Sequence, residues 1–540
     1  MFGWSRSAPP KSLVILSGIA LAALILASGC SRNKSAGAPA QILRISQRNE
    51  PSDLDPATAG LPDEFFIIRA LSEGLLSPAP TGGAPQPAAA ERYEISADGL
   101  TYTFHLRADG RWSNGEPVTA GDFIASFRRV LTPATAAPKA DLFYAVKNAR
   151  AFAAGTLQDF EAVGLHAPDP RTVVVTLERP RPNFPLYVAT GPWIPVHPPT
   201  VARLGRNWTK PENFVGNGPF TLAEWRSQQR IVVKKNPRYH AADSIKVDEI
   251  QFLRFDSGDA EERAFRAGQL DVTMSIPRNK LAAYGKDRPA ELHRTLLAET
   301  HYLSFNTTRA PLGDARVRRA LSLAIDRVRL VARVLLGGQE PATRVVPPPL
   351  RATPNQTGTP LPSEHRFAPD EARRLLAEAG FANGKNFPNL EITAWSPSQA
   401  SVLEAVQQMW RQELGIEIAI VVREARVHLE ALRSGTYDIG FVTTLLDVLD
   451  ASALLADFVG GAPGNLPQWR DREFDALLAR AEGQDAAKNL VTAEDLLLQR
   501  APIAPLYFNT RSWLMSPRVQ GWQDDALWTR YYHDVYLDQK

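Results

Sequence analysis

Cysteine is almost absent from this 540-residue chain, which has one, Cys30. A single thiol excludes an intramolecular disulfide and any metal site built from several cysteines. The nine histidines are scattered, and no pair has the spacing of a His-Glu-x-x-His zinc motif. The Gly-x-Ser-x-Gly, Walker A and dinucleotide-binding motifs are also missing from the sequence. We therefore expect no cofactor and no metal, and we predict that the chain is not an enzyme.

A strong excess of either charge is lacking too. The sequence has 61 basic and 58 acidic residues, and two of the basic residues, Arg6 and Lys11, precede Cys30. A nearly neutral body offers no broad attraction to phosphate backbones, so nucleic acid is not an expected partner. With 44% hydrophobic and 22% charged residues, the composition is that of a folded protein. About 500 residues exceed what one hydrophobic core normally serves, so we expect two or more domains.

Long apolar runs are limited to one, at residues 12–29. Arg6 and Lys11 stand before it and small residues end it, which is the order of an export signal. A cysteine placed directly after these small residues resembles the lipobox of bacterial lipoproteins. We therefore predict that residues 1–29 are a lipoprotein signal peptide and that Cys30 carries a lipid anchor. The alternative is an uncleaved membrane anchor, although about 18 apolar residues are only marginally long enough to span a bilayer.

Periodic patterns in the rest of the chain predict both strands and helices. Alternating apolar residues indicate strands at 41–45, 100–107, 173–177, 230–234, 390–394 and 416–422. Apolar stripes at helical spacing indicate helices at 314–325, 369–379 and 402–414. Asp314 is placed to cap the first helix, Pro369 to begin the second, and Gly415 to end the third. This alternation of strand and helix predicts a mixed sheet with covering helices.

Short motifs follow one another in a fixed order along nearly all of the chain after Cys30. They occupy residues 50–56, 73–76, 89–107, 112–123, 216–222, 235–239, 265–271, 302–307, 314–326 and 501–507. The most diagnostic is Trp112-Ser-Asn-Gly-Glu-Pro-Val-Thr-Ala-Gly-Asp-Phe123. Each motif is weak alone, but their ordered sum resembles the oligopeptide-binding family (family 5, or cluster C) of the extracytoplasmic solute-binding proteins of ABC importers. By themselves, Asn114-Gly115 predicts a turn, and Trp112 and Phe123 predict core anchors beside it.

The resemblance implies an α/β fold of the periplasmic-binding-protein-like type, with two lobes, a hinge and an extra domain in one lobe. It implies the following division: anchor and linker at 30–40; domain I at 41–79, 201–298 and 508–540; domain II, the extra domain, at 80–200; domain III, the second lobe, at 299–507. The implied function is to capture peptides between the lobes and deliver them to a membrane permease. The implied partners are a peptide, the transmembrane subunits of that permease, and the membrane through Cys30. We expect a monomer in the cell envelope, facing the periplasm or the extracellular side.

A carrier of varied peptides must recognise what all peptides share, namely backbone amides, an α-ammonium and an α-carboxylate. One protein carboxylate that faces the ammonium fixes the register of the ligand. In the family this group is an Asp three residues after a Trp and shortly after a Tyr-Asp pair. Counted from Tyr437-Asp438, Asp447 falls on that position. The alternative for Asp447 is a helix-capping or solvated role, and Asp450 is the neighbouring competitor.

Two departures from the family pattern flank Asp447. Thr444 stands where the Trp would be, and Phe441 replaces a basic residue that in some members helps to hold the ligand carboxylate. We therefore expect a ligand range that differs from that of a general oligopeptide carrier. Asn306 and Glu50 lie in segments expected to contribute backbone contacts to the ligand.

Two other interpretations of the function stay open. The same fold carries nickel complexes, sugars and haem in other proteins, so the ligand need not be a peptide. The scaffold could also serve as a peptide sensor that contacts a receptor and transports nothing.

Overall fold

The computed structural model describes residues 1, 3, 40–79, 83–351, 366–481, 485–523 and 525–538. The chain divides into two compact units, Met1–Gln41 and Ile42–Lys540, and the described strands and helices all lie in the second unit. Cys30 and almost all of the predicted signal peptide and linker lie outside the described residues. Among the described residues, no helix combines the length and the apolar character needed to cross a membrane.

The first sheet joins the start of the second unit to a segment some two hundred residues later. Its strands, in spatial order, are β1 (Ile42–Gln47), β10 (Glu249–Arg254), β9 (Arg230–Lys235) and β8 (Phe220–Arg226). β1 runs parallel to β10, and the other neighbours are antiparallel. Leu43 and Ile45 are fully buried, as the alternation in β1 predicts, and they share a core with Ile67 and Ile68 of helix α2 (Pro62–Leu71).

The second sheet is antiparallel and has an aromatic core of its own. Its strands, in spatial order, are β4 (Ala90–Ile95), β5 (Thr101–Leu106), β7 (Thr172–Thr176) and β6 (Leu165–Asp169). Helix α3 (Ala120–Leu131) supplies Phe123 and Phe127 to this core, and Trp112 is buried beside them. Gly115 has φ +99° and donates its N–H to the carbonyl of Trp112, so the predicted turn and its buried anchors are confirmed.

The third sheet is mixed, as predicted. Its strands, in spatial order, are β12 (Glu340–Pro341), β16 (Ile503–Leu514), β11 (Leu292–Phe305), β15 (Ile439–Thr443), β13 (Leu390–Ala394) and β14 (Ile418–Val422). β13 is parallel to β14 and β15, whereas β11 is antiparallel to β15 and β16. Helices α9 (Ala315–Leu323), α11 (Pro369–Glu378) and α12 (Pro397–Leu414) share its core. The carboxylate of Asp314 caps α9 by accepting the N–H of Arg316 at 2.8 Å, and Gly415 ends α12 at φ +70°.

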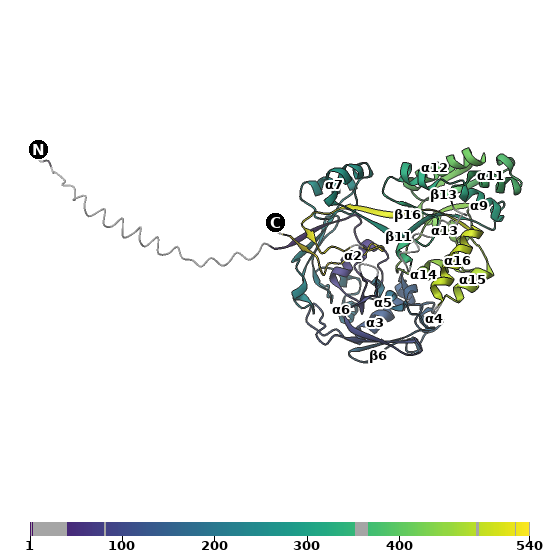
Figure 1. The fold of residues 1–540 in the computed structure, drawn as a ribbon. Coiled ribbons are helices and arrows are strands. Elements are labelled where there is room, and N and C mark those ends of the chain that lie inside the picture. The colour runs from purple at the N-terminus through teal and green to yellow at the C-terminus, as the bar shows by residue number, and fades with distance from the viewer. Residues whose placement is uncertain are drawn as a thin grey trace. The chain divides into compact units, whose positions relative to one another are not determined.

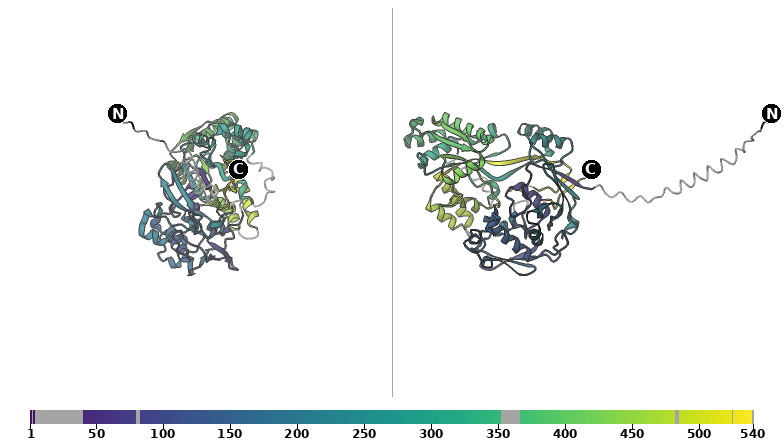
Figure 2. Two further views of the ribbon diagram at one scale, coloured as in Figure 1. Left: turned by 90° about the vertical axis from the view of Figure 1, so that its left-hand side faces the viewer. Right: turned by 180° about the vertical axis from the view of Figure 1, so that it is seen from behind.

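The long strands β11 and β16 run from one core to another (Figure 1, Figure 2). They pair from Leu292 opposite Leu514 to Ser304 opposite Ile503, with an irregular stretch between Leu296 and Thr300. Leu514 packs with a small cluster around helix α7 (Gly258–Arg266), whereas Leu303 belongs to the core of the third sheet. The predicted domain boundaries at 298/299 and 507/508 fall next to each other in this ladder, where Thr300 pairs with Phe508.

Shorter elements complete the described fold. The small sheets are β2 (Leu76–Ser77) with β3 (Gln86–Pro87), and β17 (Val519–Gln520) with β18 (Tyr536–Leu537). The remaining described α-helices are α4 (Ala149–Ala153), α5 (Phe184–Val188), α6 (Pro198–Leu204), α8 (Leu281–Asp287), α10 (Arg327–Leu330), α13 (Ala425–Ser434), α14 (Ala451–Ala456), α15 (Arg472–Ala479) and α16 (Ala486–Arg500).

Candidate ligand-binding site

The loop between β15 and α14 carries the predicted anchor Asp447 and lies against the segment that holds the second sheet. Lys139, just before the 3₁₀ turn Ala140–Phe143, donates from its Nζ to both carboxylate oxygens of Asp447, at 2.9 and 2.8 Å. Both side chains keep some contact with solvent, at 27% and 35% exposure. The predicted ligand anchor is therefore engaged by an ammonium group, and that group belongs to the protein.

Two neighbours of Asp447 fix the same loop by other means. Val448 is buried and belongs to the aromatic core of the second sheet. Asp450 accepts the Nδ2–H of Asn183 at 2.6 Å and the hydroxyl of Tyr187 at 3.0 Å, and it caps α14 through the N–H of Ser452. Burial raises the pKa of Tyr187, and the charge of Asp450 adds to the increase. Asp450 is thus committed to holding the loop, which leaves Asp447 as the better candidate for a ligand.

Thr444 and Phe441 face the protein rather than an open pocket. The Thr444 hydroxyl accepts the N–H of Thr300 at 2.7 Å, so Thr444 extends the pairing between β15 and β11. The Phe441 ring is fully buried, and its neighbours include Trp395 and His301, whose rings it meets edge to face. Phe441 is therefore part of the core of the third sheet.

The Asn306 side chain holds the segment before β15, the strand that leads to Asp447. It is fully buried, and its Nδ2 donates to the carbonyls of Gly435 and Tyr437 at 2.9 Å each. Its Oδ1 accepts the N–H and the hydroxyl of Thr308 at 3.2 and 2.7 Å. With every amide group engaged, the Asn306 side chain positions the start of β15 and leaves no polar atom for a ligand.

Glu50 lies at a different place, beside the turn between β8 and β9. Its carboxylate accepts the indole N–H of Trp225 at 2.9 Å and the backbone N–H of Gln228 at 2.8 Å. Desolvation opposes ionisation, but these hydrogen bonds, with that of Ser227, hold the pKa of Glu50 below its ordinary value. Glu50 therefore ties the end of β1 to the first sheet, and no described contact links it to Asp447.

Two further carboxylates near Asp447 are not predicted by the sequence patterns. Asp141 follows Lys139, and Asp457 follows α14. Desolvation raises the pKa of Asp141, and the negative charge of Asp447 adds to it; desolvation and the charge of Asp141 raise the pKa of Asp457 to about 6. Both residues are exposed, so the shifts reflect partial desolvation and neighbouring acidic charge rather than full burial. No local pattern signals this cluster, because its two halves, residues 139–141 and 447–457, are separated by about three hundred residues.

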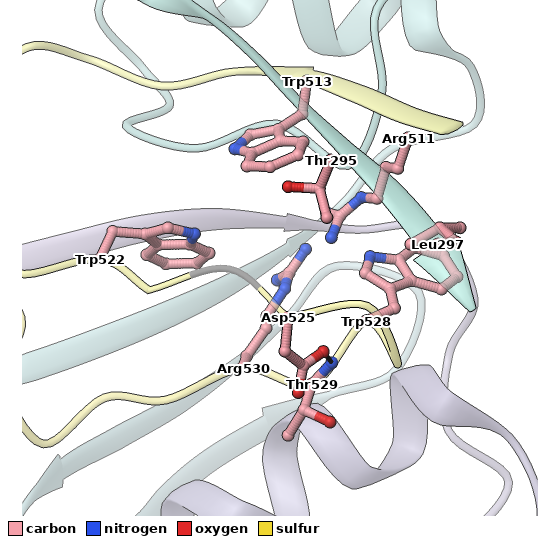
Figure 3. A pocket seen from close by; sticks show the side chains of 9 residues that line it. All are labelled: Thr295, Leu297, Arg511, Trp513, Trp522, Asp525, Trp528, Thr529 and Arg530. Carbon is pink, nitrogen blue, oxygen red and sulfur yellow. Dashed lines mark hydrogen bonds between the residues drawn. The ribbon is translucent and has the colours of Figure 1, made fainter. Parts of the chain in front are cut away.

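Three hollows of the described structure lie elsewhere. The smallest, about 10 Å³ between β11, β16 and the C-terminal segment, has room for about one water molecule (Figure 3). The guanidinium groups of Arg511 and Arg530 point into it among tryptophan rings. A hollow of about 490 Å³ adjoins Ser52 and Arg129, and one of about 670 Å³ adjoins α8 and residues 331–338. Asp447 lines none of these three, and the described residues contain no His, Cys, Asp and Glu cluster suited to a metal ion.

Comparisons with known proteins identify the protein family to which this chain is similar. The family described as bacterial extracellular solute-binding proteins, family 5 (middle region), matches residues 84–465. The probable deoxycholate-binding periplasmic protein YgiS of Escherichia coli is 33% identical over 493 residues, which cover 90% of this chain and 91% of YgiS.

Two solved structures show the same likeness. The murein tripeptide binding protein MppA of Escherichia coli is similar with a TM-score of 0.78 and 30% identity, over 93% of this chain and 99% of that one. Haemophilus influenzae OppA in complex with the peptide RPPGFSPFR is similar with a TM-score of 0.75 and 29% identity, over 93% and 99%.

The fold is thus that of the two-lobed periplasmic binding proteins, which confirms the predicted fold class. The chain belongs to family 5 of the bacterial extracellular solute-binding proteins, which confirms the resemblance seen in its motifs.

Proposed function

We propose that this protein is the binding component of an ABC importer that captures peptides between its lobes and delivers them to a membrane permease. The observation that carries the proposal is the position of Asp447. It lies on a loop of the third-sheet lobe (residues 299–507) that contacts the second-sheet segment (residues 80–200) and already binds an ammonium group. A peptide offers the same group at its N-terminus. Relatives named as peptide-binding proteins, one of them in complex with a nonapeptide, support the same ligand class.

Peptide capture on this frame is a matter of binding and closure rather than of catalysis. Asp447 pairs with the ligand ammonium, and strand-like backbone bonds the ligand amides, so affinity does not depend on ligand side chains. Asn306 and Glu50 contribute by fixing the segments that lead into the cleft. Contacts made across both lobes favour the closed state, with residues 292–305 and 503–514 as the hinge and the predicted domain boundaries within them.

A titration tests the peptide assignment directly. Tryptophan fluorescence and calorimetry with free di- to pentapeptides should show saturable binding by the full chain, and mass spectrometry should detect peptides retained after native purification. Absence of a response to every peptide, together with retention of another solute, would refute the assignment.

A non-peptide solute is the second candidate, and two observations favour it. Lys139 already neutralises Asp447, and a relative that is 33% identical is named as deoxycholate-binding. Deoxycholate is an apolar acid without an ammonium group, so it would leave the Lys139–Asp447 pair intact. Titration with deoxycholate beside the peptides decides between the two ligand classes.

The proposed place of action is the cell envelope. The apolar run before Cys30 supports export and lipid anchoring, and the family is one of extracellular proteins. We infer that the chain works as a monomer, facing the periplasm or the cell exterior, and that the permease recognises its closed form. Co-purification with permease subunits from detergent-solubilised membranes tests transport; binding to a receptor alone would favour the sensor alternative.

A further inference from the structure

The pair between Lys139 and Asp447 has the form of a bound ligand terminus. The Lys139 ammonium donates to both oxygens of one carboxylate, at 2.9 and 2.8 Å, across a separation of 308 residues. A peptide α-ammonium carries the same charge and the same three donors, and it would seek the same two oxygens. Lys139 and a ligand ammonium therefore compete for one acceptor.

The charge around this pair is not balanced. Asp141 and Asp457 add two carboxylates, each electrostatically coupled to its acidic neighbour. Within the described part of the chain, neither has a Lys, Arg or His partner within 4.0 Å, whereas Asp450 has Arg181 at 3.6 Å. One internal ammonium thus stands among three carboxylates, those of Asp141, Asp447 and Asp457, which favours the approach of a second cation.

Lys139 can leave Asp447 without undoing the contact between the two parts of the protein. Val448 stays in the aromatic core of the second sheet, and Asp450 keeps its bonds to Asn183 and Tyr187. These contacts do not involve Lys139. The pair is also partly solvated, so its rupture costs far less than that of a buried ion pair.

We propose that Lys139 is a specificity-determining residue, an internal competitor that occupies Asp447 until the ammonium group of a ligand displaces it. The proposal rests on the peptide-binding function proposed above. Displacement exchanges one ammonium for another, so a free N-terminus gains little affinity over a blocked one. Lys139 thereby reduces the difference in affinity between ligands with and without an ammonium group.

Paired titrations of the full chain measure this competition. The probes are trialanine and N-acetyl-trialanine. The readout is the dissociation constant of N-acetyl-trialanine divided by that of trialanine, both measured by calorimetry. In Lys139→Met the ratio should rise about fivefold in favour of the free peptide, because Asp447 then lacks an internal partner. Lys147→Met is the matched control, since Lys147 is exposed on the same part of the chain and makes no described ion pair, and it should leave the ratio unchanged. Asp447→Asn in the Lys139→Met background should abolish the gain.

The outcomes separate this inference from the function on which it rests. If both peptides bind the wild type and the ratio is the same in Lys139→Met, the competitor role of Lys139 is refuted and the peptide function stands. If the wild type binds neither these two peptides nor any of the di- to pentapeptides, and retains another solute, the peptide function fails and the inference fails with it. A crystal structure of the wild type with trialanine gives an independent answer that needs no variant: the ligand ammonium on Asp447 with Lys139 withdrawn supports displacement, and Lys139 still on Asp447 overturns it.

Discussion

Charged side chains inside this protein are held by partners from distant segments, and Glu494 of α16 is the clearest case. It is 4% exposed, accepts the N–H groups of Val345 and Val346 at 3.0 and 2.8 Å, and pairs with Arg344 at 2.9 Å. Desolvation raises the pKa of Glu494 despite this pairing. Its carboxylate thus ties the segment after β12 to α16.

Removal of this buried carboxylate should destabilise the protein. Glu494→Ala should lower the free energy of unfolding by about 3 kcal/mol, because Arg344 and two backbone donors lose their acceptor. Asp495→Ala is the matched control: it also contacts Arg344 at 2.9 Å but is 51% exposed, so its loss should cost less than about 1 kcal/mol. Urea unfolding of both variants provides the measurement. Equal losses would mean that burial does not decide the strength of this pair.

Asp457, which lies near Asp141, should make the stability of the protein depend on pH. Its pKa of about 6 lies above the ordinary value, so the folded protein holds this proton more tightly than the unfolded chain does. The contribution of Asp457 to stability therefore falls as pH rises from about 4 to 6 and stays low above that range. The charge that acts on it directly is that of Asp141, which in turn interacts with Asp447 and Lys139.

The variant Asp457→Asn isolates this effect, since it stays neutral at every pH. It should melt at a higher temperature than the wild type at pH 7, and the difference should fade as pH falls to 4. Asp256→Asn, at a side chain that is 92% exposed, should show no such trend. A thermal advantage of Asp457→Asn that persists undiminished at pH 4 would contradict the assignment.

At the scale of elements, the bend before β8 depends on the absence of side chains. Gly218 donates its N–H to the carbonyl of Leu71 at 3.0 Å, and a Cβ there would lie 2.5 Å from the N atom of Ser72. The Gly218→Ala substitution should therefore cost about 2 kcal/mol or more, because backbone atoms must move apart. Gly121→Ala in α3 is the control, since its Cβ would meet only the Thr119 hydroxyl at 3.6 Å, and it should be neutral or slightly stabilising. Thermal melts of the two variants compare the sites.

Elements whose signals are local could be predicted from the sequence, and contacts between elements could not. Asp314 and Gly415 mark helix ends because capping acts over three or four residues. The order of the third sheet places β15 between β11 and β13, and no short pattern encodes that order.

The candidate site shows the same limit. Counting from Tyr437 singles out Asp447, but its partner Lys139 stands 308 residues away, and no sequence pattern links the two. Phe441 lies in β15, where the first four residues are all buried, so no alternation tells which side faces a ligand. Its predicted contact with a ligand, like those of Thr444, Asn306 and Glu50, stays a prediction.

At the scale of the whole molecule, two kinds of connection between the third-sheet lobe and the rest stand out among the described residues. The strands β11 and β16 form a continuous connection, and the loop 444–450 adds side-chain contacts with the second-sheet segment. Covalent strands persist when the lobes part, whereas side-chain contacts break. We infer that these two strands act as the proposed hinge and that the contacts of loop 444–450 separate when it opens; this loop contains the proposed ligand anchor.

The predicted lipid at Cys30 bears on location and not on ligand binding, because the candidate site lies wholly within the second unit. Replacement of Cys30 by Ser should move the protein from the membrane pellet to the soluble fraction while the dissociation constant for a bound peptide stays unchanged. A single acyl chain binds membranes reversibly, so stable retention of the wild type requires more than one chain on the anchor. Cell fractionation, intact-mass measurement of the mature N-terminus and calorimetry together check the prediction. If the Ser variant lost both membrane association and ligand binding, the anchor and the binding site would not be independent. If the Ser variant stayed at the membrane, an uncleaved apolar anchor would be favoured over a lipid.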